Sequence, residues 1–361
     1  MNIKQIRLKS ILLTISFLLA HNIFGIQNEK LVPSPLLVMD GLFSHHVLIA
    51  EKSTHLLHLY EFKNDSPTLI KTYDMATGKK AGDKIFQGDH RTPEGIYHFV
   101  DFLTHGDLIK RHGQEKGKIY GVGAFVMNYP NIMDIREKKT GSGIWLHSTN
   151  DETRIEKGLD SRGCIVTANT HLIDIAKYIE LYKTPIIVVH DLKFLKESSW
   201  QKKRDNISNT ISTWLESWRN EDIETYSQQY HSEFNDPSRG NYSQFKQYKK
   251  AVFAQPGKPL IDLKNINVFQ IDDYAVATFQ QSYESNTIQD LGKKTLYLKR
   301  DPFYNWKIVS EQWSKHGIDK DSSGAVAFQP SMRFFKTQNP TQIMGDLLEN
   351  PDSPQKEEGS N

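Results

Sequence analysis

The sequence predicts a mixed fold of two domains: a β-rich, sandwich or barrel-like domain over residues 46–192, followed by an α+β domain over residues 206–315. Three observations support this prediction. Short apolar runs between glycine- and proline-containing turns dominate the first region. The second region starts with apolar residues at helical spacing and continues with alternating strands. The chain of 361 residues is long enough for two domains.

The first domain is expected to consist of short strands separated by polar turns. Its helix follows Asn169, which can cap a helix over about residues 170–181, because Leu172, Ile175 and Ile179 recur at helical spacing. The glycines and the Thr-Pro-Glu-Gly turn of residues 77–95 indicate loops instead. The expected strands cover residues 47–51, 56–62, 69–73, 96–100, 124–127, 143–147 and 184–190.

The second domain is expected to begin with a helix over residues 207–230. Ile207, Ile211, Trp214 and Trp218 are spaced at helical intervals in this stretch. An antiparallel sheet would follow, because runs of strand-forming residues succeed one another without further helical spacing. The expected strands cover residues 261–268, 274–283, 294–300 and 306–313.

Three further segments flank these domains. Residues 26–45 are interpreted as a linker or a small N-terminal packing element, in which two prolines break any early helix. Residues 193–205 are interpreted as a charged, helix-favouring linker. Residues 316–361 are polar and rich in proline, so we expect a loose tail with one short helix near residues 341–348.

Residues 1–25 are predicted to be a signal peptide. A basic start precedes an apolar run over residues 11–20, which is too short for a comfortable membrane span. Cleavage would follow Ala20 or Gly25. The alternative is an uncleaved N-terminal anchor, which would tether the protein to the membrane. In both cases the body of the chain would be exported.

The composition excludes several classes of function. The net charge of +2 gives no indication of nucleic-acid binding. There is neither a second cysteine nor a His-Glu-x-x-His run, so no metal site is predicted. No phosphate-binding loop or dinucleotide fingerprint is present, and no cofactor is expected. The sequence leaves the oligomeric state open, including a homodimer.

The single cysteine, Cys164, is the strongest indication of catalysis. An exported chain with one cysteine cannot form an internal disulfide, and an idle thiol is a liability in an oxidising compartment. His147, at the end of an apolar strand, is the candidate base for a Cys164 nucleophile. Gly163 would let the backbone approach the substrate, and the N–H groups of Gly163 and Cys164 would form an oxyanion hole. The alternatives are an inert buried cysteine and a structural histidine.

The residues around Cys164 resemble the L,D-transpeptidase (YkuD-type) catalytic domain family. The resemblance rests on His147 and the Ser-Arg-Gly-Cys-Ile run from Ser161, on Gly88-Asp-His-Arg-Thr-Pro-Glu-Gly-Ile-Tyr97, and on Tyr129-Pro-Asn. It covers roughly residues 45–192. Three positions depart from the common pattern: Arg162 replaces His, Val166 replaces Asn, and Ser148 stands where many members have Gly.

The Arg162 variant is similar to a branch that includes peptidoglycan L,D-carboxypeptidases of helical and curved Gram-negative bacteria. Those proteins carry a C-terminal nuclear-transport-factor-2-like (NTF2-like) domain, which residues 207–313 resemble. The resemblance implies a periplasmic enzyme acting on stem peptides of the meso-diaminopimelate type. It would remove terminal D-Ala from tetrapeptides through a thioester. The alternatives are an L,D-transpeptidase that forms 3-3 cross-links or attaches a lipoprotein, and a catalytically silent wall-binding protein.

The resemblance also implies roles for particular residues. The main-chain carbonyl of Ser148 would orient the imidazole of His147. Arg162 would bind a peptide carboxylate through its guanidinium, the alternative being a surface salt bridge with Asp160. Further candidates for the substrate cleft, each with a turn or strand role as the alternative, are Ser161, Asn150, Tyr129, Arg91, Asp89, Thr92 and Tyr120.

Overall fold

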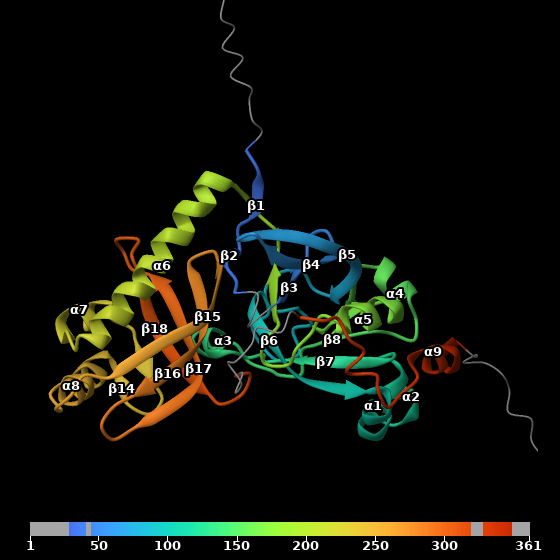
Figure 1. Ribbon diagram of the computed structural model, residues 1–361. Helices are drawn as coiled ribbons and strands as arrows, with labels where there is room; N and C mark the ends of the chain where they lie inside the picture. The colour runs from blue at the N-terminus through green and yellow to red at the C-terminus, as the bar shows by residue number, and fades with distance from the viewer. Residues whose placement is uncertain (1–28, 41–44, 319–327, 349–361) are drawn as a thin grey trace, which may run out of the picture.

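The computed structural model describes residues 29–40, 45–318 and 328–348, and shows two domains side by side (Figure 1). The predicted signal peptide, residues 1–25, lies outside the described residues. The β-rich first domain and the α+β second domain are confirmed. Among the described residues, no helix is both long and apolar enough to cross a membrane.

The first domain is a sheet that closes on itself. Its strand order is β10-β8-β7-β6-β11-β3-β4-β5, and β10 pairs with β5 as well as with β8, which completes a barrel-like ring. A further short strand, β9, pairs with β5. The strands are β3 (His46–Glu51), β4 (Leu56–Lys63), β5 (Ser66–Gly78), β6 (Gly95–Thr104), β7 (Gly123–Met127), β8 (Trp145–His147), β9 (Leu159–Ser161), β10 (Ile165–Thr167) and β11 (Pro185–Val189).

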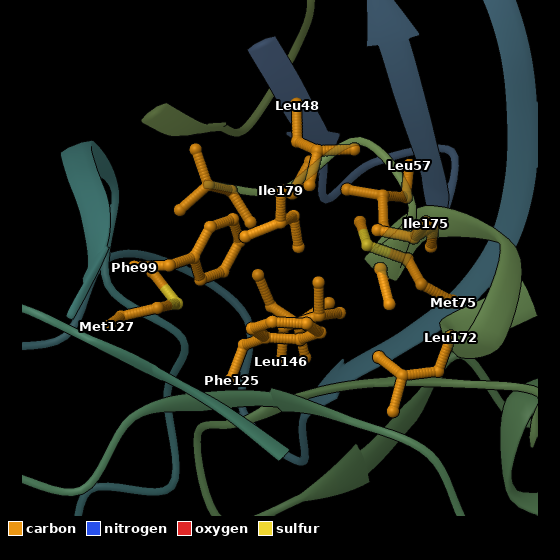
Figure 2. Close-up of a cluster of buried hydrophobic side chains, with 14 of the residues drawn as sticks. Leu48, Leu57, Met75, Phe99, Phe125, Met127, Leu146, Leu172, Ile175 and Ile179 are labelled. Carbon is orange, nitrogen blue, oxygen red and sulfur yellow. The ribbon is translucent and has the colours of Figure 1, made fainter. Parts of the chain in front are cut away.

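The core of the first domain lies inside this ring. Figure 2 shows Phe99 and Phe125 facing Ile179 and Leu48 across it. Because apolar side chains alternate along the strands, one face of each strand contributes to this core. The helices of the domain are α1 (His105–His112), α2 (Gln114–Lys118), α3 (Ile132–Arg136), α4 (Thr153–Glu156) and α5 (Asn169–Ala176).

The second domain packs helices on one face of an antiparallel sheet. The strand order is β18-β17-β16-β15-β2, with β15 (Leu260–Ile271), β16 (Tyr274–Glu284), β17 (Gln289–Arg300) and β18 (Trp306–Ser314). The short strands β13 (Asn235–Asp236) and β14 (Gly240–Asn241) form a separate pair. The helices are α6 (Glu197–Arg219), α7 (Ile223–Gln228) and α8 (Tyr242–Phe253).

The helix expected over residues 207–230 differs from the structure at both ends. It begins earlier, at Glu197, and it is interrupted between α6 and α7, where Glu221 has a positive φ of 59° and Asp222 caps α7. The apolar spacing continues through the interruption, because Trp214, Trp218 and Tyr226 enter the same core. Periodicity alone therefore could not locate the break.

The N-terminal segment joins the two domains. Strand β1 (Leu31–Pro33) pairs with β12 (Phe194–Lys196), and β2 (Leu36–Val38) becomes the edge strand of the second domain's sheet. Residues 193–205, expected as a linker, connect the domains as β12 and the first turns of α6. A cluster that contains Leu36, Ile187 and Val309 buries apolar side chains from both domains.

The expectation of a loose C-terminal tail is wrong for residues 328–348. Phe335 is buried, at 4% exposed, in the core of the first domain, and its ring meets that of Phe102 with centroids 5.5 Å apart. The short helix expected near residues 341–348 is present as α9 (Pro340–Leu348). Its Ile343 and Met344 pack against the same core. The contacts join residues more than 200 positions apart, so no local pattern indicates them.

Candidate active site

A cleft of about 670 Å³ opens in the first domain, where β8 and β10 place His147 and Cys164. Its walls combine loops on either side of these strands with the segment that follows α2. The lining residues are Lys79, His112, Lys116, Ile119, Tyr120, His147, Asn150, Asp151, Arg154, Asp160, Ser161, Arg162 and Cys164.

The strand register puts Cys164 and His147 on the same face of the sheet. β10 runs parallel to β8, with Ile165 beside Leu146 and Val166 beside His147. Extending that register by one residue places Cys164 beside Trp145, two residues before His147. Side chains two residues apart share a face, and the offset along the strand is roughly 6.6 Å. Cys164 accordingly packs against the cluster that contains Trp145.

His147 is held in one tautomer by its own chain. Its Nδ1 lies 2.5 Å from the carbonyl oxygen of Ser148. Because a carbonyl can only accept, Nδ1 carries the proton, and Nε2 of the neutral imidazole is free to take another. Burial lowers the pKa of His147 to about 4; the Ser148 carbonyl raises it, and the nearby Arg154 charge lowers it further. The imidazole is therefore a neutral base at neutral pH.

Cys164 rests as a thiol. Burial raises its pKa to about 11, against the opposing effects of the Trp145 backbone N–H and of the Arg154 and Lys84 charges. The sulfur lies 3.6 Å from the carbonyl oxygen of Gly143, to which the thiol can donate. A thiol of high pKa beside an imidazole of low pKa is a neutral pair. Sulfur attack in this site therefore requires proton transfer to the base as the bond forms.

Ser161 shapes the loop that presents the nucleophile. Its hydroxyl donates to the carbonyl oxygen of Cys164 at 2.6 Å and accepts from the N–H of Gly163 at 3.0 Å. The expected oxyanion role of the Gly163 N–H is therefore wrong, because that donor already bonds within the loop. The turn role considered for Ser161 agrees with these bonds, but the sequence could not indicate that its hydroxyl uses the N–H of Gly163.

Arg162 and Asn150 are exposed at the cleft, as the sequence analysis expected. The salt bridge considered for Arg162 is absent, because Asp160 instead binds Nε of Arg154 at 2.5 Å. Within the described part of the chain, Arg162 has no ion pair and no hydrogen-bonded partner for its guanidinium. It is thus a cation next to the nucleophile loop that is available to a ligand.

Two expected substrate contacts lie elsewhere. The buried Tyr129, which follows the end of β7, donates its hydroxyl to the carbonyl oxygen of Thr140 at 3.1 Å and packs in the domain core. The Arg91 guanidinium reaches the carbonyl oxygen of Asp83 at 3.4 Å and does not line the cleft. The main chain of Arg91 nevertheless borders the loop that carries Cys164, because its carbonyl oxygen packs on Gly163.

Asp89 and Thr92, the other two candidates in that loop, have structural partners. Asp89 binds the buried Lys84 at 2.7 Å and accepts backbone N–H groups from its own loop, which together lower its pKa to about 2 despite burial. The hydroxyl of Thr92 accepts from the N–H of Gly78 at 2.8 Å. Both residues build the loop against which Gly163 packs.

Several cleft residues could not be found from the sequence. Arg154 binds Asp160, the Thr149 hydroxyl and, at 3.4 Å, the carbonyl oxygen of Ile119, so it ties three segments together at the cleft. His112 and Lys116 come from α1 and α2, two short helices of eight and five residues. Among the described residues, no group of three or more His, Cys, Asp or Glu side chains is placed to hold a metal ion.

Comparison with known proteins agrees with this architecture. The sequence profile of the L,D-transpeptidase catalytic domain matches residues 45–188, and that of the Cds6 C-terminal NTF2-like domain matches residues 206–312. No curated protein sequence matches the chain.

Two solved structures are similar along most of the chain. Bd1075 from Bdellovibrio bacteriovorus is 31% identical, with a TM-score of 0.69 over 81% of this chain and 100% of that one. The helical cell shape determining protein Pgp2 from Campylobacter jejuni is 26% identical, with a TM-score of 0.62 over 78% of this chain and 95% of that one. The chain therefore belongs to the L,D-transpeptidase catalytic domain family, in a form that carries a C-terminal NTF2-like domain.

Proposed function

We propose that this protein is an exported L,D-carboxypeptidase that removes the terminal D-Ala from peptidoglycan tetrapeptides. One observation carries the proposal. A thiol and a neutral imidazole share a cleft with Arg162, a cation without a partner among the residues that the structure describes. Membership of the L,D-transpeptidase family supports activity on peptidoglycan, and the free guanidinium suits a substrate that ends in a carboxylate.

Cys164 and His147 can carry out the reaction as two acyl transfers, first from D-Ala to the cysteine and then from the cysteine to water. His147 Nε2 takes the thiol proton as Sγ of Cys164 attacks the carbonyl carbon of the meso-diaminopimelate–D-Ala bond. The tetrahedral adduct collapses when the C–N bond breaks, and the D-Ala amine leaves with the proton held by His147. Water then gives a proton to His147 and attacks the thioester. Cys164 recovers the proton as thiol, and the tripeptide leaves with a new carboxylate.

Arg162 would fix the end of the substrate. A terminal D-Ala carboxylate bound to its guanidinium would lie next to the loop that carries Cys164, which sets the scissile bond near the sulfur. The charge would also favour tetrapeptides over substrates whose D-Ala carboxylate is already in an amide. This is the feature that favours a carboxypeptidase over an enzyme that cleaves within a longer chain.

The alternatives differ in what accepts the acyl group. An L,D-transpeptidase would pass the acyl group to an amine and form 3-3 cross-links or attach a lipoprotein. A wall-binding protein without activity would leave the substrate unchanged. Incubation of the purified protein with disaccharide tetrapeptide, followed by separation of the products, distinguishes all three.

We expect disaccharide tripeptide and an equal amount of free D-Ala. Cross-linked dimers without tripeptide would favour the transpeptidase. An unchanged substrate, together with binding to sacculi by both the native protein and Cys164→Ala, would favour the silent wall-binding protein.

The similarity to a helical cell shape determining protein supports a role for the trimming reaction in cell shape. Export to the periplasm is part of the same proposal, because peptidoglycan lies outside the cytoplasmic membrane. Fractionation of cells that express the full chain tests it. We expect the protein in the periplasmic or membrane fraction, and recovery only from the cytoplasm would contradict export.

A further inference from the structure

Ser148 faces two parts of the active site at once. Its carbonyl oxygen holds the Nδ1 proton of His147, whereas its side chain is directed to the turn at residues 120–122. The residue is fully buried. A glycine at this position would supply the carbonyl but not the hydroxyl. The hydroxyl therefore has to be explained separately.

The hydroxyl of Ser148 is part of a tight contact with that turn. It accepts the N–H of Val122 at 2.8 Å, the shorter branch of a bond that the N–H shares with the Asn169 Oδ1 at 3.2 Å, and it reaches the carbonyl oxygen of Tyr120 at 3.4 Å. Gly121 lies between them with φ +61°, and a Cβ there would come within 2.3 Å of the Ser148 Oγ and 2.4 Å of the Asn169 Oδ1. The turn thus closes directly onto the serine.

The same turn places an aromatic wall beside the base. The Tyr120 ring stands edge-on to the His147 imidazole, with centroids 5.0 Å apart, and lies 5.1 Å from the Trp145 ring. Tyr120 follows α2 and precedes β7, so the turn connects the helical part of the cleft wall to the barrel. If the turn moves away from Ser148, the Tyr120 ring must move away from His147.

We propose that the Ser148 hydroxyl is a positioning element for the catalytic base: by fastening the 120–122 turn, it keeps the Tyr120 ring over His147 and excludes water from the imidazole. This proposal rests on the proposed function, since it assigns His147 the role of base. Water exclusion lowers the pKa of the imidazole and so keeps it neutral at acidic pH, and a neutral imidazole is the form that accepts the thiol proton.

The other groups around His147 stay in place when the hydroxyl is removed. Arg154, on α4, disfavours the protonated imidazole, and Asp160, on β9, favours it. Cys164 and Tyr120 also line this cleft, and its other titratable or charged residues are Lys79, His112, Lys116, Asp151 and Arg162. Of these, His112 contacts the Tyr120 ring, with centroids 5.1 Å apart. Arg154 and Asp160 are bound to each other, so we expect their combined effect on the pKa of His147 to be the same in wild type and variant. A change in the pKa of His147 when the Ser148 hydroxyl is removed can therefore be attributed to movement of the 120–122 turn.

The test is Ser148→Ala, which retains the carbonyl. Water that enters beside Tyr120 should move the pKa of His147 toward the ordinary histidine value of about 6.5. If it reached about 6, activity would fall about tenfold at pH 5 but little at pH 8, because only the neutral imidazole is active. The measurement is kcat/KM for disaccharide tetrapeptide at both pH values, expressed as a ratio to wild type.

A second readout does not need turnover. The ring nitrogens of His147, labelled with ¹⁵N and assigned by comparison with His147→Gln, can be titrated by NMR in the free protein. We expect the midpoint to rise in Ser148→Ala and in Tyr120→Val, which opens the same wall without touching Ser148. Loss of the proposed enzymatic activity would leave this titration measurable, so the two proposals can fail separately.

Ser217→Ala is the matched control. Ser217 is also a buried serine, 4% exposed, and its hydroxyl donates to the carbonyl oxygen of Trp214 in the second domain. We expect Ser217→Ala to have a lower Tm than wild type but the same pH dependence of kcat/KM and the same His147 midpoint. An unchanged His147 midpoint in folded Ser148→Ala would overturn the proposal, whatever Tyr120→Val shows. If Ser148→Ala does not fold, the Tyr120→Val titration alone decides the point.

Discussion

At the scale of single residues, the geometry of the nucleophile depends on Gly163. Its φ of +130° lies in a region that other residues avoid, and a Cβ there would be 2.8 Å from the carbonyl oxygen of Arg91. The Ile144 side chain, 3.0 Å from the same point, closes the other side. The loop can therefore pass between these neighbours only with a glycine immediately before Cys164.

We predict that Gly163→Ala lowers kcat/KM by at least about 100-fold, because a shift of about 1 Å at a reacting atom costs that much. The strain should also lower the free energy of unfolding by about 1–3 kcal/mol. Gly88→Ala is the control. Gly88 also has a positive φ, +86°, but a Cβ added there would have no atom within 4 Å. Steady-state kinetics and urea unfolding measure both effects. Native activity in Gly163→Ala would contradict this reading of the loop.

The sequence could indicate the two residues proposed to react but not their environment. Cys164 was predictable because it is the single cysteine, and His147 because it ends a strand upstream of it. The use of the Gly163 N–H by Ser161 and the pairing of Arg154 with Asp160 depend on loop conformation. Tyr129 and Arg91 were assigned to the cleft wrongly because a motif gives the order of residues and not the direction of a side chain.

At the scale of elements, the C-terminal segment behaves as a strap on the first domain. Phe334 and Phe335 contact Phe102, with ring centroids 5.0 and 5.5 Å apart, and Phe334 also contacts Phe125. Phe125 pairs with Leu146 on β8, the strand that ends in His147. The strap is thus packed one layer behind the catalytic strand, which gives it a direct influence on the stability of the site.

We predict that Phe335→Ala lowers the free energy of unfolding by about 3–5 kcal/mol, as expected for truncation of a buried phenylalanine. Phe303→Ala is the matched control. Phe303 is 84% exposed, so its truncation should change stability by less than about 0.5 kcal/mol. Denaturant unfolding of the two variants tests the strap. Equal stabilities would mean that residues 328–348 do not pack on the barrel in solution.

The strands and helices were predictable to different degrees. The continuous apolar run of β3, which is buried on both faces, and the partly alternating runs of β4 and β6 indicate the positions of these strands. β5 extends from Ser66 to Gly78, well beyond the expected residues 69–73, because its polar end pairs with β9 and β10. α8 escaped prediction because Phe245 is its single fully buried residue.

At the scale of the whole molecule, the two domains form one packed body. The N–H of Ile96 on β6 donates to the Tyr274 hydroxyl on β16 at 3.1 Å, and Lys293 of β17 binds the carbonyl oxygen of Tyr182 at 2.6 Å. The order of the domains was readable from the change in apolar spacing. Their interface was not, because β2 crosses from the N-terminal segment into the second sheet.

Buried histidines make the stability of this body depend on pH. Burial lowers the pKa of His46 and of His147 to about 4 in the folded protein, below the ordinary value of about 6.5. The unfolded chain therefore binds more protons between these values, and the folded state loses stability as the pH falls from about 6.5 to 4. At pH 5 the loss is about 2 kcal/mol for each histidine.

We predict a lower urea midpoint at pH 5 than at pH 7.5. The double variant His46→Gln/His147→Gln should show a smaller difference between the two pH values, because the glutamines do not titrate. Unfolding curves at constant ionic strength measure both. Greater stability of the native protein at pH 5 would show that these histidines are not buried in their neutral form.

The acyl-enzyme on Cys164 tests the central claim most directly. Disaccharide tetrapeptide is mixed with the protein, the reaction is quenched in acid, and the intact mass is measured. We predict a protein species whose mass exceeds that of the free protein by the mass of the substrate minus that of D-Ala, and peptide digestion should map the added group to Cys164. With Cys164→Ala we predict neither this species nor any tripeptide. Tripeptide formation by Cys164→Ala, or an adduct on another residue, would contradict the assignment of Cys164 and His147 as the reacting pair.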